Sequence, residues 1–168
     1  MEYIYETNRL RLKEFTLNDS EFIVELLNSP GWLQFIGDRN INTEEQAKNY
    51  LENGPIKSYK ENGYGLWLVE KKDDSIAIGM CGIIKRETLD HPDIGFAFLP
   101  GFIGKGYAFE IASATMEYAK HQLNISKILA ITVSNNSKSI RLLEKIGLKF
   151  IKPINFPVSK EELLLYSN

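Results

Sequence analysis

The amino-acid sequence predicts a mixed α/β fold, in which a mostly antiparallel sheet also contains one parallel pair of strands. The first observation is an alternation of apolar and charged residues from Leu10 to Phe15, typical of a strand with one wet face. The second is a succession of strand, long helix and strand patterns over residues 93–99, 106–122 and 127–133. Two strands joined by one helix imply a right-handed crossover and parallel pairing.

Length and composition fit one folded domain. The chain has 168 residues, within the range of roughly 100–200 residues that is usual for a single domain. Hydrophobic residues make up 43% and charged residues 25%, so a packed core is available. The 20 Lys and Arg against 22 Asp and Glu give a net charge of −2, without the basic excess of proteins that bind nucleic acids or membrane surfaces. We therefore expect a single domain over residues 1–168 with neither of those partners.

Targeting signals and cysteine chemistry are not visible in the sequence. No run approaches the roughly 20 apolar residues of a spanning helix, and residues 1–6 lack the basic and apolar parts of a secretory signal. The one cysteine, Cys81, cannot form an internal disulfide or a cysteine zinc cluster, and in its apolar strand we expect a buried, inert thiol. These features predict a cytoplasmic protein without a bound metal.

The elements of the first half follow from caps and periodicity. Asn18 can cap a short helix whose apolar residues recur at helical spacing. Thr43-x-x-Gln46 is a capping box and predicts the start of a second helix. Two strands are expected at residues 65–70 and 76–84, separated by a polar turn.

The elements of the second half have sharper limits. The apolar run at 93–99 has the length of a strand, and residues 106–122 carry small and apolar residues on one helical face. The apolar pattern of residues 127–133 predicts another buried strand. A last helix is expected from Asn136 to Ile146, ended by Gly147 at the usual C′ position.

A glycine pair, Gly104-Lys105-Gly106, joins the end of a strand to the start of a long helix. There, unpaired backbone N–H groups converge with the positive end of the helix dipole, which suits a pyrophosphate. By position alone, a plain tight turn is an equal alternative. A Walker A loop is excluded because Gly106 follows Lys105 and Leu99 stands where its first glycine belongs. A Rossmann fingerprint is excluded because Phe109 stands where it requires Gly or Ala.

Two blocks in this order resemble motifs of the GNAT superfamily of N-acetyltransferases. The loop Gly101-x-x-Gly104-x-Gly106 is similar to motif A, Gln/Arg-x-x-Gly-x-Gly/Ala, without its leading Gln or Arg. The block from Asn136 to Leu148 is similar to the family's Asn-x-x-Ser…Glu-Lys-x-Gly-Phe motif, with Leu in the usual Phe position. The first half resembles the ribosomal-protein (Rim-type) branch of the family through three segments, residues 31–38, 43–47 and 65–67.

The resemblance implies a GNAT-like fold, with a central mixed sheet, flanking helices and a splayed parallel pair formed by residues 93–99 and 127–133. The pantetheine arm of acetyl-CoA would lie in the wedge between these two strands. The backbone of Ala97, Phe98 and Leu99 would pair with the arm as an added strand does. An amide N–H near Phe98 or Leu99 would polarise the thioester carbonyl.

The resemblance also implies residues that hold the rest of acetyl-CoA. The pyrophosphate would be cradled by six consecutive residues, Ile103, Gly104, Lys105, Gly106, Tyr107 and Ala108. Asn136 would hydrogen-bond the cofactor from the start of its helix, with Ser139 nearby. A helix N-cap explains the type and position of Asn136 equally well.

The reaction implied by the resemblance is direct transfer of acetyl from acetyl-CoA to a primary amine, without a metal or a covalent enzyme intermediate. Asp93 is the candidate base or proton relay, because Rim-type enzymes often carry Glu before an Ile-Gly-Tyr/Phe sequence, here residues 94–96. A turn carboxylate that follows His91-Pro92 is the alternative for Asp93. Leu143 stands where many family members place the Tyr that protonates the departing thiolate, so the general acid is unassigned.

The expected acceptor is a protein N-terminal α-amine, with a small-molecule amine as the nearest alternative. At pH 7 an α-amine of pKa 7.7–8.0 is about 10–15% neutral, whereas a lysine side chain is only about 0.04% neutral. A module that binds CoA thioesters without turnover is a third hypothesis, favoured by Leu143. Trp32, Phe35 and Trp67 either line an acceptor pocket or pack in the core. Both a monomer and a homodimer fit the sequence.

Overall fold

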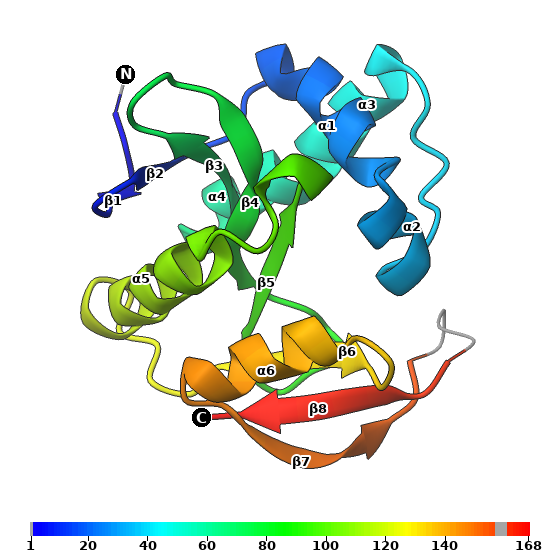
Figure 1. The fold of residues 1–168 in the computed structure, drawn as a ribbon, viewed down its shortest axis with the longest axis vertical. Helices are drawn as coiled ribbons and strands as arrows, with labels where there is room; N and C mark the ends of the chain where they lie inside the picture. Colours follow the sequence, from blue (N-terminus) through cyan, green and yellow to red (C-terminus); the bar gives the residue numbers. More distant parts are fainter. Residues whose placement is uncertain (1, 157–160) are drawn as a thin grey trace.

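One mixed sheet organises the molecule (Figure 1). The computed structural model describes residues 2–156 and 161–168. Within them, eight strands lie side by side in the order β1-β2-β3-β4-β5-β6-β8-β7. The strands are β1 (Tyr5–Glu6), β2 (Leu10–Lys13), β3 (Leu66–Lys71), β4 (Ala77–Ile84), β5 (Asp93–Phe98), β6 (Leu129–Val133), β7 (Lys149–Ile154) and β8 (Leu163–Ser167).

Helices flank the sheet and occupy the connections between strands. The helices are α1 (Ser20–Leu27), α2 (Pro30–Phe35), α3 (Glu44–Leu51), α4 (Lys57–Asn62), α5 (Tyr107–His121) and α6 (Ser137–Lys145). A π-helical turn at Glu52–Ile56 joins α3 to α4, and 3-10 turns at Leu17–Asp19 and Pro100–Phe102 precede α1 and follow β5. The predicted strands β3 to β6 and helices α5 and α6 lie within two residues of their expected limits.

The parallel pair of strands opens the sheet. Neighbouring strands pair antiparallel except β5 and β6, which are parallel. In the described part of the chain, β5 and β6 pair at Asp93 and Leu129 alone, the first residue of each strand. The strands separate beyond this point (Figure 1). The prediction of a mixed, mostly antiparallel sheet with a splayed parallel pair is confirmed.

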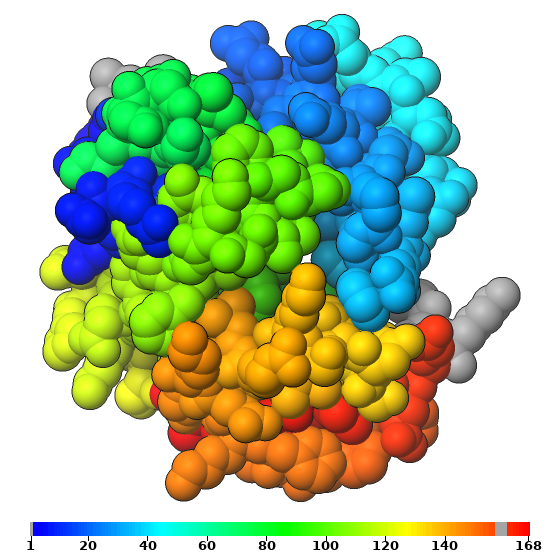
Figure 2. All heavy atoms as spheres, in the orientation of Figure 1, coloured from blue at the N-terminus to red at the C-terminus, as the bar shows by residue number. Residues whose placement is uncertain are grey.

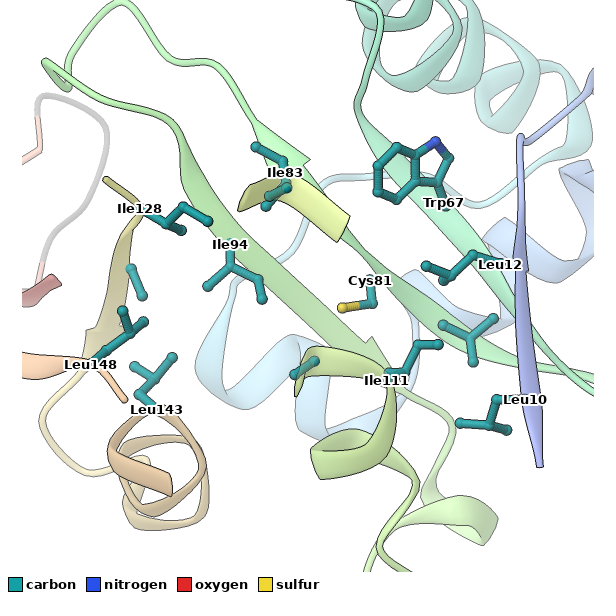
Figure 3. Packing of buried hydrophobic residues seen from close by; sticks show 14 of the residues in the cluster. Leu10, Leu12, Trp67, Cys81, Ile83, Ile94, Ile111, Ile128, Leu143 and Leu148 are labelled. Carbon is teal, nitrogen blue, oxygen red and sulfur yellow. The ribbon is translucent and has the colours of Figure 1, made fainter. Parts of the chain in front are cut away.

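Side chains that alternate along the central strands enter two separate cores. Trp67 and Cys81 pack on the face covered by α5, where Ile111 contributes to the same cluster (Figure 3). Leu68 and Met80, the sequence neighbours of Trp67 and Cys81, pack on the opposite face with α1 and α3. Strand pleating therefore divides β3 and β4 between the two layers of helices.

Local capping explains where the helices begin. The capping box of Thr43 and Gln46 is confirmed, and the side-chain oxygen of Asn136 accepts from the Ser139 amide at 3.3 Å, as an N-cap does. The prediction that Asn18 caps the first helix is wrong. Asn18 lies inside the 3-10 turn that leads into α1, and Thr16 caps this turn: its hydroxyl accepts from the Asn18 amide, and its own amide donates to Asp19.

Three further features bear on function. The Cys81 side chain is fully buried, and this burial raises the pKa of its thiol to about 12. The described residues contain no group of three His, Cys, Asp or Glu side chains arranged to hold a metal ion. Among the helices that the structure describes, none combines the length and the apolar character needed to cross a membrane.

Candidate active site

A cavity of about 620 Å³ lies where β5 and β6 diverge. Its size falls within the range of about 300–1,000 Å³ typical of small-molecule sites. The walls come from the two strands (93–97 and 130–133), from α6 (Asn136, Ser139 and Leu143), from α2 with the loop after it (32–37 and 39) and from Tyr50 of α3, among others. Figure 2 shows the surface hollowed between α2 in blue, the green segment that leads into α5, and α6 in orange.

The register of β5 decides which backbone groups face this cavity. The Leu99 amide donates to the Ile78 carbonyl of β4 at 2.9 Å. Because antiparallel pairing alternates along a strand, the polar groups of Ala97 also face β4, whereas those of Phe96 and Phe98 face the side of β6. Since β6 has already separated there in the described structure, Phe96 and Phe98 form an unpaired strand edge.

This register corrects part of the sequence-based expectation. The amide of Leu99 and the backbone of Ala97 are engaged by β4 and are not available to pair with a ligand. The backbone of Phe98, which the resemblance implied would pair with the arm, faces the open side of β5, and so does that of Phe96. A shift of one residue in the pairing of β5 with β4 would exchange the backbone groups that face β4 with those that face the cavity. The sequence alone does not determine this register.

The glycine loop follows directly from the end of β5. Gly104 and Gly106 both adopt φ of +81°, a left-handed conformation that favours glycine. Nothing lies within 4 Å of a Cβ built at Gly104, whereas one at Gly106 would meet the Arg9 guanidinium at 3.3 Å. Amides in the first turn of α5, which starts at Tyr107, have no partner within the helix. The loop therefore offers open N–H groups at the positive end of a 15-residue helix.

The position of this loop relative to the cavity follows from the strand between them. Asp93 lines the cavity at the closed end of the wedge, and the loop begins after Phe98 at the other end of β5. At about 3.3 Å per residue, β5 spans roughly 17 Å. An elongated ligand laid along the edge of β5 would thus reach from the cavity to the glycine loop.

A brace from the turn between β1 and β2 holds the glycine loop. Arg9 donates to the Lys105 carbonyl at 3.0 Å, and its guanidinium lies 4.4 Å from the centre of the Tyr107 ring. Its Nε also pairs with Glu110 of α5 at 2.7 Å, and the Thr7 hydroxyl donates to the same carboxylate at 2.7 Å. Burial acts to raise the pKa of Glu110, but the hydrogen bonds from Thr7 and Arg9 outweigh it and hold the pKa below its usual range. This brace was not predicted from the sequence.

We expect Glu110→Gln to destabilise the fold by about 1–2 kcal/mol at pH 7, because it removes the charge that Thr7 and Arg9 hydrogen-bond. Since the folded-state pKa of Glu110 is lowered, the stabilisation is present above the unfolded-state pKa and is lost as the pH falls through the folded-state value. Urea denaturation of both proteins from pH 7 to pH 3 measures it. Glu117→Gln, exposed on the same helix, is the control. An equal loss in both variants, or one that does not shrink in acid, would contradict the assignment.

Asp93 is the buried carboxylate at the closed end of the wedge. Its side chain is 1% exposed, and its Oδ1 accepts from Nε of Arg86 at 3.0 Å. Burial raises the pKa of Asp93 to about 6, even though the neighbouring Arg86 lowers it. At pH 7 the carboxylate is therefore mainly ionised, yet it can accept a proton near neutrality. The side chain lines the cavity, unlike that of a solvated turn carboxylate.

One face of α6 closes the other side of the cavity. Asn136, Ser139 and Leu143 all line it, as residues near three and four apart on a helix do. The Asn136 side-chain oxygen caps the helix, but its NH₂ group keeps two donors for a ligand. Leu143 is 1% exposed and brings no titratable group to this wall.

The aromatic residues considered from sequence divide between cavity and core. Trp32 and Phe35 line the cavity, whereas Trp67 is buried in the core beneath α5. Within the described structure, Nε1 of Trp32 is buried without a hydrogen-bond partner. Tyr50 of α3 also lines the cavity. It was not predicted there, because its position depends on how α3 packs against the sheet.

Comparisons with known proteins cover nearly the whole chain. The acetyltransferase (GNAT) domain family matches residues 9–149. An uncharacterized N-acetyltransferase of Bacillus subtilis, YnaD, is 29% identical over 143 residues, which are 85% of this chain and 81% of YnaD.

Two solved structures with different acceptors share the fold. RimL, a ribosomal L7/L12 α-N-protein acetyltransferase in complex with coenzyme A, has a TM-score of 0.84 at 15% identity, over 99% of this chain and 97% of RimL. A chimera of the spermidine N-acetyltransferase SpeG from Vibrio cholerae and hSSAT has a TM-score of 0.75 at 18% identity, over 94% of this chain and 93% of the chimera. At these identities the two structures establish a common fold alone.

Proposed function

The chain belongs to the acetyltransferase (GNAT) domain family, and we propose that it transfers the acetyl group of acetyl-CoA directly to a primary amine. The observation that carries the proposal is the unpaired edge of β5, which runs from a buried carboxylate in a cavity to a glycine loop at the N-terminus of α5. This arrangement matches the shape and chemistry of acetyl-CoA, a long amide-bearing arm with a thioester at one end and a pyrophosphate at the other.

The residues that would hold acetyl-CoA follow from the geometry of each part. The edge groups of Phe96 and Phe98 pair with the amides of the arm, as an added strand does. Their N–H groups also supply the hydrogen bond that stabilises negative charge on the thioester oxygen during attack. The pyrophosphate is bound by the loop from Ile103 to Ala108. Asn136 hydrogen-bonds the cofactor from the start of α6, with Ser139 nearby on the cavity wall.

The acceptor amine must lose a proton before it attacks the thioester. Asp93 is our candidate for the base or proton relay, because its carboxylate lines the cavity and has a pKa of about 6. A base of this strength suits an α-amine, of which about 10–15% is already neutral at pH 7, better than a lysine side chain at about 0.04%. We therefore propose a protein N-terminal α-amine as the preferred acceptor, with a small-molecule amine as the second candidate.

Matched peptides test this acceptor preference. Each peptide contains one lysine, and its α-amine is either free or blocked. We expect mass spectrometry to find the added acetyl group on the α-amine of the free peptide, with at least tenfold less product from the blocked one. Acetylation of the lysine at equal rates in both peptides would contradict the α-amine preference and leave amine acetylation standing.

Leu143 favours a second candidate function, a module that binds CoA thioesters without turnover. Within the described wall of α6, no titratable side chain stands at this position to protonate the departing thiolate. A thiol of pKa near 8.5 leaves well as a thiolate, so this absence does not by itself prevent transfer.

We expect Leu143→Tyr to change kcat by less than about tenfold, because thiolate departure does not need an added acid. The position is packed in the core, so the larger ring will also cost stability, about 1–3 kcal/mol. Leu143→Phe adds the same ring without the hydroxyl and separates packing from chemistry. A hundredfold gain in kcat with Tyr that Phe does not reproduce would show that proton donation limits the reaction.

A further inference from the structure

An unpaired arginine stands on the part of the cavity left for the acceptor. With acetyl-CoA along β5, the remaining wall includes α2, the loop after it and Tyr50 of α3, together with Arg86 and Glu161. Arg39 lies in that loop, lines the cavity and is exposed. Across residues 2–156 and 161–168, the structure shows no hydrogen bond or ion pair for its guanidinium.

The carboxylates of the same wall do not neutralise this cation. Asp93 is paired with Arg86 at 3.0 Å, and Glu161, the other carboxylate of the described wall, has an interaction of its own. Both Arg39 and Arg86 lie within electrostatic reach of the partly buried Tyr50: desolvation raises the pKa of this phenol, and the two guanidiniums oppose the rise. The acceptor side of the cavity therefore carries a guanidinium that has no ion-pair partner in the described structure, close to a second, paired arginine.

This charge pattern selects among amines. A guanidinium beside an apolar wall binds a carboxylate well, because its planar fork makes two parallel charge-assisted hydrogen bonds. A polyamine would bring a second cation toward Arg39 and would be repelled. Trp32 lies on the same wall, and its buried indole N–H has no hydrogen-bond partner in the described structure.

We propose that the acceptor is an amine that carries a carboxylate close to the reacting nitrogen, and that Arg39 binds this carboxylate. The inference rests on the proposed acetyl transfer and names the class of its acceptor. The amine lies toward Asp93, where the ammonium form is attracted, and the carboxylate lies toward Arg39. An acidic side chain near the start of a peptide and the α-carboxylate of a free amino acid are the two sources of this chemistry.

Two pairs of acceptors separate the sources. The first pair consists of identical peptides with a free α-amine and either Asp or Asn at positions two and three. The second pair is phenylalanine and phenethylamine, which differ in the α-carboxylate. At low salt we expect kcat/KM to favour the acidic member of one pair by at least about tenfold, and the favoured pair identifies the source. Spermidine should be a poorer acceptor than either favoured compound.

Variants at Arg39 show whether this residue causes the preference for acceptors that carry a carboxylate. Arg39→Gln should reduce the preference to within about twofold, Arg39→Lys should keep part of it, and 0.5 M salt should weaken it. Acetyl-CoA affinity should stay within about threefold in both variants. Arg141→Gln, an exposed arginine of α6 outside the cavity wall, is the control and should keep the full preference.

The outcomes distinguish this inference from the proposed function. Equal rates within both pairs, a preference that survives Arg39→Gln, or a large loss of acetyl-CoA affinity in that variant would each overturn the role of Arg39 and leave amine acetylation intact. If no member of either pair releases CoA, and neither does any other primary amine, the proposed transfer fails and the inference fails with it.

Discussion

Replacement of Asp93 by asparagine should lower kcat/KM at pH 7 by at least a hundredfold, while acetyl-CoA affinity stays within about threefold. Asparagine keeps the shape of the side chain but cannot take the proton of the attacking amine, and a positioned base or relay contributes about 10²–10⁴ in rate. Acetyl-CoA contacts are spared because Asp93 lies at the closed end of the wedge, at the opposite end of β5 from the glycine loop.

The pH profile separates a base from a structural carboxylate. Wild-type kcat/KM should rise through the Asp93 pKa of about 6, a rise that Asp93→Asn lacks. The deficit of the variant should shrink toward pH 9, because an α-amine of pKa near 8 then deprotonates in solution. Asp90→Asn, an exposed neighbour, is the control and should follow the wild type. A deficit that does not change with pH, or no deficit at all, would return Asp93 to a structural role.

The raised pKa of Asp93 also predicts an effect on stability. Because its folded-state pKa of about 6 exceeds the unfolded value near 3.9, the folded state holds the proton more tightly, and stability falls as the pH rises between the two values. Relative to Asp93→Asn, the wild type should lose up to about 3 kcal/mol between pH 4 and pH 7. Paired urea titrations measure this loss, and parallel curves would show that burial does not perturb this carboxylate.

Gly106→Val should weaken acetyl-CoA binding at least tenfold. The backbone φ of +81° is disfavoured for a branched side chain, and the added atoms would meet the Arg9 guanidinium that braces the loop. The side chain would also obstruct the close approach of the pyrophosphate to the backbone N–H groups.

The control for this variant is a second glycine with the same backbone requirement. Gly147 ends α6 at φ of +98°, with nothing within 4 Å of an added Cβ. Gly147→Val should therefore lose a similar amount of stability but bind acetyl-CoA as the wild type does. Titration calorimetry on the folded variants compares them. Wild-type affinity in Gly106→Val, or an equal loss in both, would contradict a binding role for the loop.

Elements with local signals could be predicted, whereas elements formed by distant pairing could not. The limits of α5 and α6 follow from short-range features, such as the Asn136 cap and the Gly147 stop. Strands β7 and β8 were not predicted, although the apolar run of β8 was a usable signal, because β8 is defined by its pairing with β6 and β7. The cap at Thr16 was missed because Asn18 also had a suitable side chain.

In the candidate site, too, features with local sequence signals could be predicted, and features that depend on distant contacts could not. The glycine loop and Asp93 could be singled out from the sequence, since motif spacing and position in the chain identified them. Which amides of β5 are open depended on its register with β4, where Leu99 is engaged and Phe96 is not. Arg9 contacts Glu110, and Arg39 shares the cavity wall with residues of β5 and β6. These residues are far apart in the chain, so no sequence pattern within one segment predicts that they lie together.

Acetyl transfer itself is tested most directly by release of the CoA thiol from acetyl-CoA across a panel of primary amines, with the product identified by mass. Direct acetyl transfer predicts amine-dependent thiol release, one acetyl group on the nitrogen of the consumed amine, and loss of both in Asp93→Asn at pH 7. Acetyl-CoA that raises the melting temperature of the protein yet releases no thiol with any amine would contradict it. That result would assign the chain to CoA-thioester binding without turnover.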